Sequence, residues 1–457
     1  MLVDCYRSLL ETGWASCFAQ ARTLNRAIEH ALASPCVMGR RTISRTICAL
    51  GRQDQDWSAH YKMFSRSDWN AETLFELVMA DYLKRYPERP VVVAIDDTKI
   101  AKTGKHIRDC FWQRDPMSPP FWVNLIYGQR FIQAGLIFPH YTEADQSPRS
   151  IPIRFTEAPT VKKPGKNASD SQKQEYKRQS KLKNLSTQTL EVINSVRSAV
   201  DRNGGTDRVI FAAMDGSFCN RTIFGNKIDR IELLARCRKD ARLCFPAPPG
   251  SQRKYDDRLF TPEEVRKDEN RPWLRARIHF GGEFRDVRYK EIRGVLWRRG
   301  AGTRPLRLIV IAPQPYRVSK LSRVRYRQPA YLLSTDTSSP AVDLVRACFD
   351  RWQIEVNHRE EKDTLGVGQA QVRSPLSVDR HPAFTVASYS ILLLAALNEF
   401  GPGRTTDYLP LPKWRKNSKR PSLLDMLSLL RKQTHETSDN LLGVHNFAEN
   451  ALVFANT

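Results

Sequence analysis

The sequence predicts a mixed α/β protein in which helical segments flank a core of buried strands. Residues 91–95 and 209–214 are short apolar runs rich in β-branched side chains, which is typical of strands buried on both faces. Residues 1–86 carry apolar side chains at helical spacing, and that spacing returns after residue 340. Between these parts, polar and apolar residues alternate within 244–335, which indicates a segment rich in strands.

The composition indicates a globular protein whose partner is a polyanion. The 457 residues include 73 Lys and Arg against 49 Asp and Glu, which gives a formal net charge of +24 and a pI of about 9.8. A hydrophobic fraction of 41% is too high for a disordered chain, and a mean hydropathy of −0.50 is too low for a membrane protein. Such a charge is expected where the partner is DNA, RNA or an acidic membrane surface. The alternative is a chain that is basic throughout without such a partner.

The cysteines and the first residues favour a cytoplasmic protein. The nine Cys contain no Cys-x2-Cys pair, so neither a zinc site nor a disulfide framework is expected, and free thiols suit a reducing cytosol. Residues 1–10 include Asp4 and Arg7 and lack the apolar run of a signal peptide. The most apolar stretch, 384–397, is too short to span a bilayer and predicts a buried helix. We therefore expect no membrane association.

A short basic helix is predicted within the N-terminal helical part. Residues 40–51 include Arg41 and Arg45 and end at Gly51, which suits a helix terminus. This segment could be the second helix of a helix-turn-helix that lies in a DNA groove. The alternative is a surface helix whose Arg side chains are solvated.

Each of the two buried strands leads into acidic residues. Asp96 and Asp97 follow the first apolar run, and Asp215 follows the second. Carboxylates at the carboxyl ends of buried strands are common catalytic groups in α/β proteins, although Asp also caps turns at such places. Within the first pair we expect Asp96 to be the functional residue, with Asp97 as the alternative.

The residues between these runs predict further strands and helices. Residues 121–139 are largely apolar and predict two strands around Gly128. Residues 151–190 hold nine Lys and Arg and three acidic residues, which predicts a loop followed by a solvated basic helix over 171–186. That helix either contacts a nucleic-acid backbone or is only a charged surface. An amphipathic helix follows over 187–201.

One long helix in the last third of the chain is predicted to align three charged side chains. Arg351 lies four residues before Glu355 and Lys362 seven residues after it, so all three share one face of a continuous helix. They are either an ion-paired surface or a functional face on which Glu355 joins Asp96 and Asp215. A cluster of carboxylates needs divalent cations, and its hard oxygen ligands suit Mg²⁺ or Mn²⁺. Two such ions can promote cleavage of a phosphodiester.

This helix resembles the Tyr-x2-Arg-x3-Glu-x6-Lys motif of bacterial insertion-sequence DDE transposases, which have an RNase H-like core. Arg351, Glu355 and Lys362 match the motif, whereas Cys348 stands in place of its Tyr. The resemblance implies that Asp96, on the first strand of the core, and Asp215, on the fourth, complete a catalytic triad with Glu355.

The same resemblance implies how the chain is divided. The 140 positions from Asp215 to Glu355 are similar to those of the subgroup with a β-rich domain inserted before the catalytic Glu. Residues 112–125 and 366–373 also look like this family. We therefore expect an RNase H-like core interrupted by a β-rich insertion, with 1–86 as a helical DNA-binding domain, 87–243 as the first part of the core, 244–335 as the insertion, 336–400 as the second part of the core, and 401–457 as a basic linker and C-terminal helix.

The resemblance implies cut-and-paste transposition of DNA in the bacterial cytoplasm, on the nucleoid. Asp96, Asp215 and Glu355 would bind Mg²⁺, for which Mn²⁺ can substitute. The enzyme would cleave at the ends of an insertion sequence and join them to target DNA, as a homodimer that pairs the terminal inverted repeats. The sequence leaves undecided whether a hairpin intermediate forms. Two alternative functions also remain: a transposon-derived DNA-binding protein without catalysis, and a metal-dependent nuclease that does not transpose.

Several cationic and aromatic residues are expected to contact DNA. The related subgroup holds a flipped base by stacking it on Trp, and Trp297 is the candidate here, although Trp is also a common core residue of β-rich segments. The full set of expected DNA contacts is Arg351, Lys362, Arg236, Arg238, Trp297, Arg298, Arg41 and Arg45.

The net charge of +24 predicts DNA binding that depends steeply on salt, because phosphate contacts release condensed counterions. We expect the affinity for duplex DNA to fall at least tenfold between roughly 50 and 200 mM salt. Fluorescence anisotropy at several salt concentrations measures this dependence. An affinity that does not change with salt would contradict a nucleic-acid role for the charge.

Overall fold

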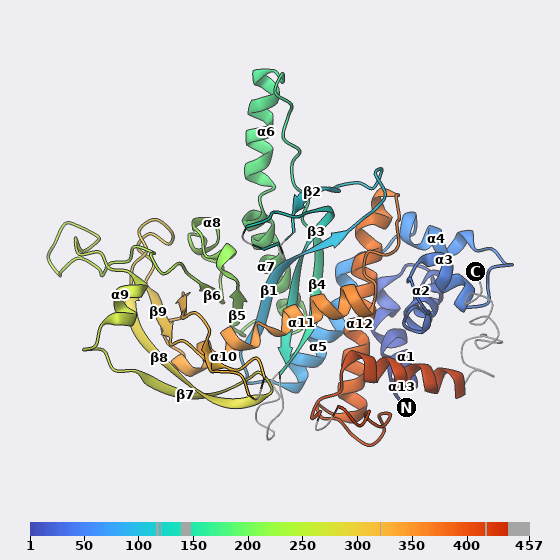
Figure 1. Cartoon of the computed structure of the whole chain (residues 1–457). Coiled ribbons are helices and arrows are strands. Elements are labelled where there is room, and N and C mark those ends of the chain that lie inside the picture. Colours follow the sequence, from blue (N-terminus) through green and yellow to red (C-terminus); the bar gives the residue numbers. More distant parts are fainter. Residues whose placement is uncertain (116–117, 120, 139–147, 320, 416–417, 437–457) are drawn as a thin grey trace.

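A β-sheet with helices on both faces forms the centre of the protein (Figure 1). The computed structural model describes residues 1–457 apart from 116–117, 120, 139–147, 320, 416–417 and 437–457. Within the described residues the sheet has ten strands: β1 (Val91–Ala101), β2 (Phe111–Arg114), β3 (Leu125–Phe138), β4 (Arg149–Glu157), β5 (Ile210–Met214), β6 (Ile231–Arg236), β7 (Leu274–Phe280), β8 (Glu283–Val295), β9 (Leu306–Ile311) and β12 (Ala330–Ser334). A separate two-stranded ribbon consists of β10 (Pro315–Tyr316) and β11 (Arg325–Tyr326).

The order of the strands shows how the chain builds this sheet. One edge of β3 pairs with β1, and its other edge pairs with β2 at one end and β4 at the other, all antiparallel. From β1 the sheet continues through β5 and β6 in parallel pairs. It then continues through β12, β9, β8 and β7 in antiparallel pairs. The predicted α/β class is confirmed, with a sheet that is mixed rather than wholly parallel.

The helices come from all parts of the chain, and the predictions of helix over 1–86 and 187–201 are confirmed. The described α-helices are α1 (Leu2–Trp14), α2 (Ala21–Ala33), α3 (Ile43–Ala49), α4 (Ser58–Ser65), α5 (Glu76–Arg85), α6 (Asp170–Leu182), α7 (Leu185–Arg202), α8 (Arg221–Phe224), α9 (Pro262–Lys267), α10 (Ala341–Asp350), α11 (Gln353–Arg359), α12 (Pro375–Phe400) and α13 (Leu423–Glu436).

Different helices cover the two faces of the sheet. α7 lies behind the sheet in Figure 1 and contributes to the apolar cluster that contains Ile95. α10 and α11 cross in front of it, where Ile354 of α11 packs with Ala94. Because successive side chains of a strand alternate between faces, Asp96 belongs to the α11 face and Asp97 to the α7 face.

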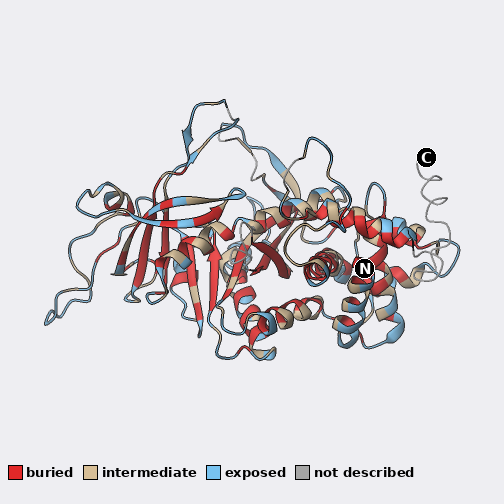
Figure 2. Ribbon diagram, turned by 90° about the horizontal axis from the view of Figure 1, so that it is seen from below, coloured by how far each residue is buried: buried red, intermediate tan, exposed pale blue. Residues whose placement is uncertain are grey.

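α12 is the centre of a helical body that both ends of the chain build. The Tyr6 hydroxyl donates a hydrogen bond to the backbone oxygen of Ser388 (3.1 Å), and the Val3 N–H donates to the Gln433 side chain (3.1 Å). Figure 2 shows α12 and the strands largely buried. Among the described helices only α12 is long and apolar enough to span a bilayer, and 78% of its most apolar window is buried in the protein. The predicted buried helix over 384–397 is confirmed.

The prediction of two strands around Gly128 was wrong, because β3 runs through that glycine without a turn. A Cβ atom at residue 128 would lie 2.0 Å from the backbone oxygen of Ile100 on β1. The glycine therefore allows the two backbones to approach closely instead of reversing the chain.

The prediction of a loop at the start of 151–190 was also wrong, because residues up to Glu157 belong to β4. Arg154 made this strand look polar, yet its side chain is fully buried. It donates a hydrogen bond to Ser195 Oγ (2.8 Å) and forms an ion pair with Glu76 (3.2 Å). A buried and paired Arg is compatible with a buried strand, which the alternation of polar and apolar residues does not reveal.

The predicted β-rich character of 244–335 is confirmed, and its strands extend the central sheet. β12 pairs with β6 through Leu332 opposite Arg236, and β9 and β8 follow. The connection makes one continuous layer from β2 to β7, so these strands share hydrogen bonds with the part of the sheet that carries Asp215.

The close approach at Gly128 predicts that Gly128→Ala destabilises the protein. The added methyl must displace the β1 backbone, and overpacking of this kind costs about 2–3 kcal/mol. Chemical denaturation followed by circular dichroism measures the loss. Gly165→Ala is the matched control, because a Cβ atom there meets nothing within 4 Å. Equal stability of the two variants would contradict the close approach.

Candidate active site

Asp96 and Asp215 become neighbours through the parallel pairing of β1 with β5. The last pair in this ladder is Ile95 with Met214, so the two Asp residues follow it side by side. β5 ends there, whereas β1 continues to Ala101 because β3 still pairs with it. Asp96 therefore lies inside a strand and not at its end, contrary to the prediction.

α11 positions Glu355 on the same face of the sheet. Ile354 is fully buried and packs on β1 and β3. The Asn357 side chain donates hydrogen bonds to the Ser150 backbone oxygen and to the Tyr389 hydroxyl, both at 3.0 Å. These two anchors lie on either side of Glu355 in sequence and hold its helix against the sheet.

Arg351 joins the carboxylates that the two segments bring together. Its guanidinium donates to Asp96 Oδ2 at 3.2 Å and to Glu355 Oε1 at 3.1 Å. The side chain of Arg351 is 9% exposed, that of Asp96 18% and that of Glu355 35%. Asp96 Oδ1 accepts a further hydrogen bond from the Asp97 N–H (2.9 Å). The structure thus brings Asp96, Glu355 and Arg351 into direct contact.

The electrostatics show that this cluster is short of positive charge. Burial, with the added effect of the Asp97 and Asp215 charges, raises the pKa of Asp96 to about 7 against the opposing effect of Arg351. Burial also raises the pKa of Glu355, where Arg351 opposes the shift and Asp215 adds to it. One guanidinium therefore does not compensate the buried carboxylates.

The prediction of one long helix carrying Arg351, Glu355 and Lys362 was wrong. α10 ends at Asp350, α11 begins at Gln353, and a π-helical turn occupies Glu360–Thr364. A π turn changes the angle between successive residues, so the spacing of seven no longer puts Lys362 on the face of Glu355. The charges around Lys362 are those of its neighbours in sequence and of Asp115 and Asp97.

Asp97, the alternative to Asp96, has its own set of cations. Burial raises its pKa, and Arg130, Lys99 and Lys362 oppose that shift. Lys99 and Arg130 face each other across the β1–β3 ladder. Sequence reasoning missed both, because only the register of two antiparallel strands brings them to the same place.

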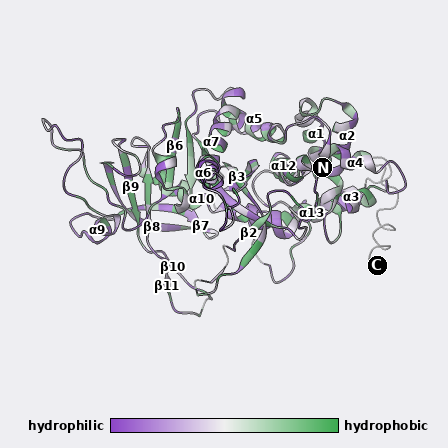
Figure 3. Ribbon diagram, turned by 90° about the horizontal axis from the view of Figure 1, so that it is seen from above, coloured by the Kyte–Doolittle hydropathy of each residue, from purple (hydrophilic) through white to green (hydrophobic). Residues whose placement is uncertain are grey.

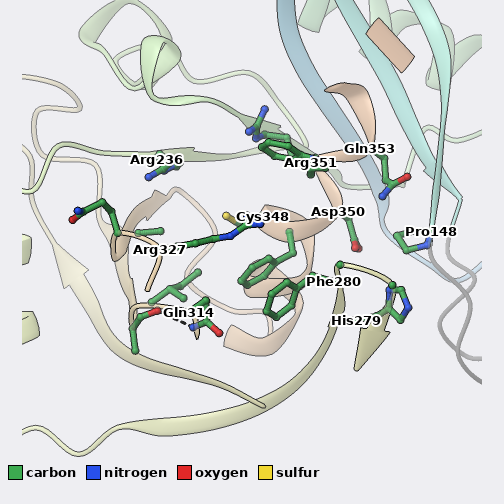
Figure 4. Close-up of a pocket in the computed structure, with 18 residues that line it drawn as sticks. Pro148, Arg236, His279, Phe280, Gln314, Arg327, Cys348, Asp350, Arg351 and Gln353 are labelled. Atoms are coloured by element: carbon green, nitrogen blue, oxygen red, sulfur yellow. Dashed lines mark hydrogen bonds between the residues drawn. The ribbon is translucent and has the colours of Figure 1, made fainter. Parts of the chain in front are cut away.

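A cavity of about 510 Å³ opens next to Arg351 (Figure 4). Arg236, Arg327 and Arg351 are arranged around it, and the rings of Phe280 and Phe349 stack at 4.5 Å within it. The Arg236 charge acts on Glu355, so the predicted position of Arg236 beside the carboxylates agrees with the structure.

Cys348, at the Tyr position of the motif, lines the same cavity. Burial raises the pKa of its thiol to about 11, against the opposing charges of Arg351 and Arg236. At neutral pH the side chain is therefore a neutral thiol, which is a weak hydrogen-bond donor compared with a Tyr hydroxyl.

The other residues near this cavity that were predicted to contact DNA make contacts within the protein instead. Arg238 is exposed and forms an ion pair with Asp240 (2.7 Å). Trp297 is half-buried, and a Cβ atom on Gly300 would lie 2.1 Å from its ring. The Arg298 guanidinium lies 5.5 Å from the centre of the Tyr255 ring. These contacts favour the core interpretation of Trp297 over base stacking.

The predicted basic helix exists as α3, with Thr42 as its N-cap. Residues 34–42 separate it from α2, a longer link than the three or four residues of a helix-turn-helix. Arg45 is exposed, whereas Arg41 is half-buried and its N–H donates to Gln369 Oε1 (2.6 Å). α3 and residues 369–374 line a groove of about 670 Å³, so this helix lies against the segment that follows the motif.

The carboxylates are not arranged as a closed metal site. Among the residues that the structure describes, no group of three or more His, Cys, Asp and Glu side chains could hold a metal ion as it stands. Arg351 accounts for this arrangement, because its guanidinium contacts both Asp96 and Glu355.

No family model matches this sequence, and no curated protein matches it either. The function is therefore proposed from the geometry of the site and from the resemblance of its motif.

The raised pKa of Asp96 predicts how its removal changes stability with pH. The carboxyl has a pKa of about 7 in the folded chain and about 3.9 in the unfolded one. The folded state therefore holds a proton longer, and the contribution of this group to stability is lost as the pH rises between these values. We expect Asp96→Asn, in EDTA, to raise the Tm more at pH 8 than at pH 5.

Differential scanning fluorimetry at the two pH values measures this effect. Asp343→Asn is the matched control, because Asp343 is an exposed carboxylate on α10 that forms an ion pair with Arg346 (3.0 Å). An Asp96→Asn variant that is stabilised more at pH 5 than at pH 8 would show that the site does not disfavour the charged form.

Proposed function

We propose that this protein is a metal-dependent DNA transposase of the insertion-sequence type, which cleaves DNA at element ends and joins the freed 3′ ends to target DNA. The contact of Arg351 with both Asp96 and Glu355 carries the proposal. It joins the motif segment to β1 across 255 residues of sequence, which is the convergence that the resemblance implies.

The donor set fits the metal that the proposal needs. Asp96, Asp215 and Glu355 offer hard oxygen ligands of the kind that Mg²⁺ and Mn²⁺ prefer. Such an ion, when bound, polarises the phosphodiester and makes water a nucleophile at neutral pH. Arg351 must then release at least one carboxylate oxygen, and its freed guanidinium can donate to a phosphate oxygen. The carboxylates would hold the ion, and Arg351 would orient the DNA.

The strand order supports an RNase H-like core within the α/β fold. β4, β3 and β1 are antiparallel neighbours, and β5 and β6 continue in parallel. Asp96 lies on the first strand, and Asp215 follows β5, the fourth along the chain when the four-residue β2 is not counted. β7, β8, β9 and β12 come between Asp215 and the motif helix, where the resemblance implies a β-rich insertion.

The cationic surfaces support DNA as the partner. Arg236 and Arg327 line the cavity next to Arg351, and Arg45 lines the groove beside α3. In the proposal these surfaces hold the element end and the target, and two copies of the chain pair two ends on the bacterial nucleoid. A nuclease that does not transpose would use the same carboxylates and differ only in its products.

Cleavage of DNA by matched variants tests this function. We expect wild-type protein with Mg²⁺ to cut plasmid DNA at the ends of the element that carries this gene, and to join those ends to a second plasmid. Asp96→Asn, Asp215→Asn and Glu355→Gln should each lower the rate at least ~100-fold, because each removes a ligand charge, while DNA binding persists. Gel analysis and sequencing of the junctions measure both steps.

Two further variants make the test specific. Asp97→Asn should cleave faster than Asp96→Asn if Asp96 is the ligand. Asp343→Asn, which removes an exposed carboxylate paired with Arg346, should cleave like wild type. Cleavage without joined products would identify a nuclease. Binding without cleavage in Mg²⁺ and in Mn²⁺ would overturn the catalytic proposal and leave a DNA-binding protein.

A further inference from the structure

We infer that residues 162–183, here called the basic arm, bind the phosphate backbone of DNA outside the catalytic site. The arm consists of an exposed loop and the helix α6. Figure 1 shows α6 standing out from the body of the protein, and the view in Figure 3 looks almost along its axis. The inference rests on the proposed function in one respect, because it takes the polyanion to be DNA.

The charge of the arm is concentrated and largely unpaired. The arm holds eight Lys and Arg and two acidic residues, a formal charge of +6 over 22 residues. Both acids are engaged within the helix: Asp170 pairs with Lys173 (3.4 Å) and Glu175 with Arg178 (2.7 Å). In the described part of the chain, no carboxylate lies within ion-pair distance of the remaining cations, which are Lys162, Lys163, Lys166, Lys177, Lys181 and Lys183.

The helix of the arm has little tertiary packing to stabilise it, because only Tyr176, Gln179 and Ser180 are half-buried. None of the 13 residues of α6 is buried, and even Leu182 is 53% exposed. A capping box of Ser169 and Gln172 begins the helix. Isolated helices of about 12–15 residues are marginal in water, so the cap and two surface ion pairs leave α6 close to unfolding. A partner that covers the helix would supply the missing stabilisation.

The spacing of the cations favours a regular polyanion. Lys173, Lys177 and Lys181 are four residues apart and form one stripe along the helix, at intervals of about 6 Å. Successive phosphates of a nucleic-acid strand repeat on a similar scale. Such a stripe can contact several phosphates of one backbone at once, which an irregular acidic protein surface does not offer.

The base of the arm is attached next to the candidate active site. Ser186, at the start of α7, accepts a hydrogen bond from the Asn220 side chain (2.8 Å). Asn220 caps α8, in the segment directly after Asp215. DNA bound at the carboxylates therefore passes close to the base of the arm, and α6, about 20 Å long, can follow its backbone outward.

A charge-neutralised arm tests the inference. We expect the triple variant Lys173→Gln, Lys177→Gln and Lys181→Gln to bind a duplex of about 30 base pairs at least tenfold more weakly than wild type. Its plot of log affinity against log salt should be shallower by about 2–3, since each lost phosphate contact removes about 0.9 from the slope. Fluorescence anisotropy gives both values. Hydrogen exchange should show α6 amides unprotected in the free protein and protected on DNA.

Two control variants remove ambiguity. Lys84→Gln, Lys227→Gln and Lys267→Gln together remove the same charge from exposed sites outside the arm and should leave the slope near that of wild type. The triple variant Lys173→Arg, Lys177→Arg and Lys181→Arg keeps the charge and should bind DNA as wild type does.

The outcomes separate the arm from the catalytic proposal. If the arm variant shows the same salt dependence of DNA affinity as the control variant of Lys84, Lys227 and Lys267, the inference is overturned and the transposase proposal stands. Arm-dependent binding by a protein that never cleaves would support the inference and overturn the catalytic proposal. Arm-dependent binding to anionic lipid vesicles, with none to DNA, would overturn the inference as well.

Discussion

The pairing of β1 is the constraint on which the rest of the structure depends. Residues 93–95 are paired on both edges, with β3 on one side and β5 on the other, and only β3 accompanies β1 beyond Ile95. At the open edge that results, Asp96 and Asp215 follow the last strand pair side by side, and Arg351 joins Asp96 to Glu355. Strands on both sides of this point belong to one continuous layer, so strand pairing fixes the backbone of Asp96 and the end of β5 that precedes Asp215, while the packing of α11 positions Glu355.

Arg351 shows how the chain offsets the repulsion between neighbouring acids with a cation of its own. Half-buried carboxylates that lie near one another repel, and the Arg351 guanidinium supplies a compensating cation from within the chain. The raised pKa of Asp96 shows that this compensation is incomplete. Under the proposed function, an external cation would replace this internal one at the carboxylates.

The sequence predicts the local elements better than the contacts between them. The apolar runs before Asp96 and Asp215 and the helical segments at both ends are confirmed, because burial on both faces and helical spacing leave strong patterns. Gly128 and Arg154 misled the prediction, since a close backbone approach and a buried ion pair have no periodic signal. Lys99 and Arg130 were missed for a similar reason, because only the strand register places them beside Asp97.

The position of α12 has a consequence for the making of the protein. The helices of residues 1–86 pack around a helix that begins at Pro375, so their apolar faces stay uncovered until almost the whole chain has been synthesised. At ~5–20 residues per second, the intervening chain takes roughly 15–60 s to appear. During that time the nascent N-terminal part is a natural client for chaperones, and a chain that terminates early would leave it permanently exposed to aggregation and proteolysis.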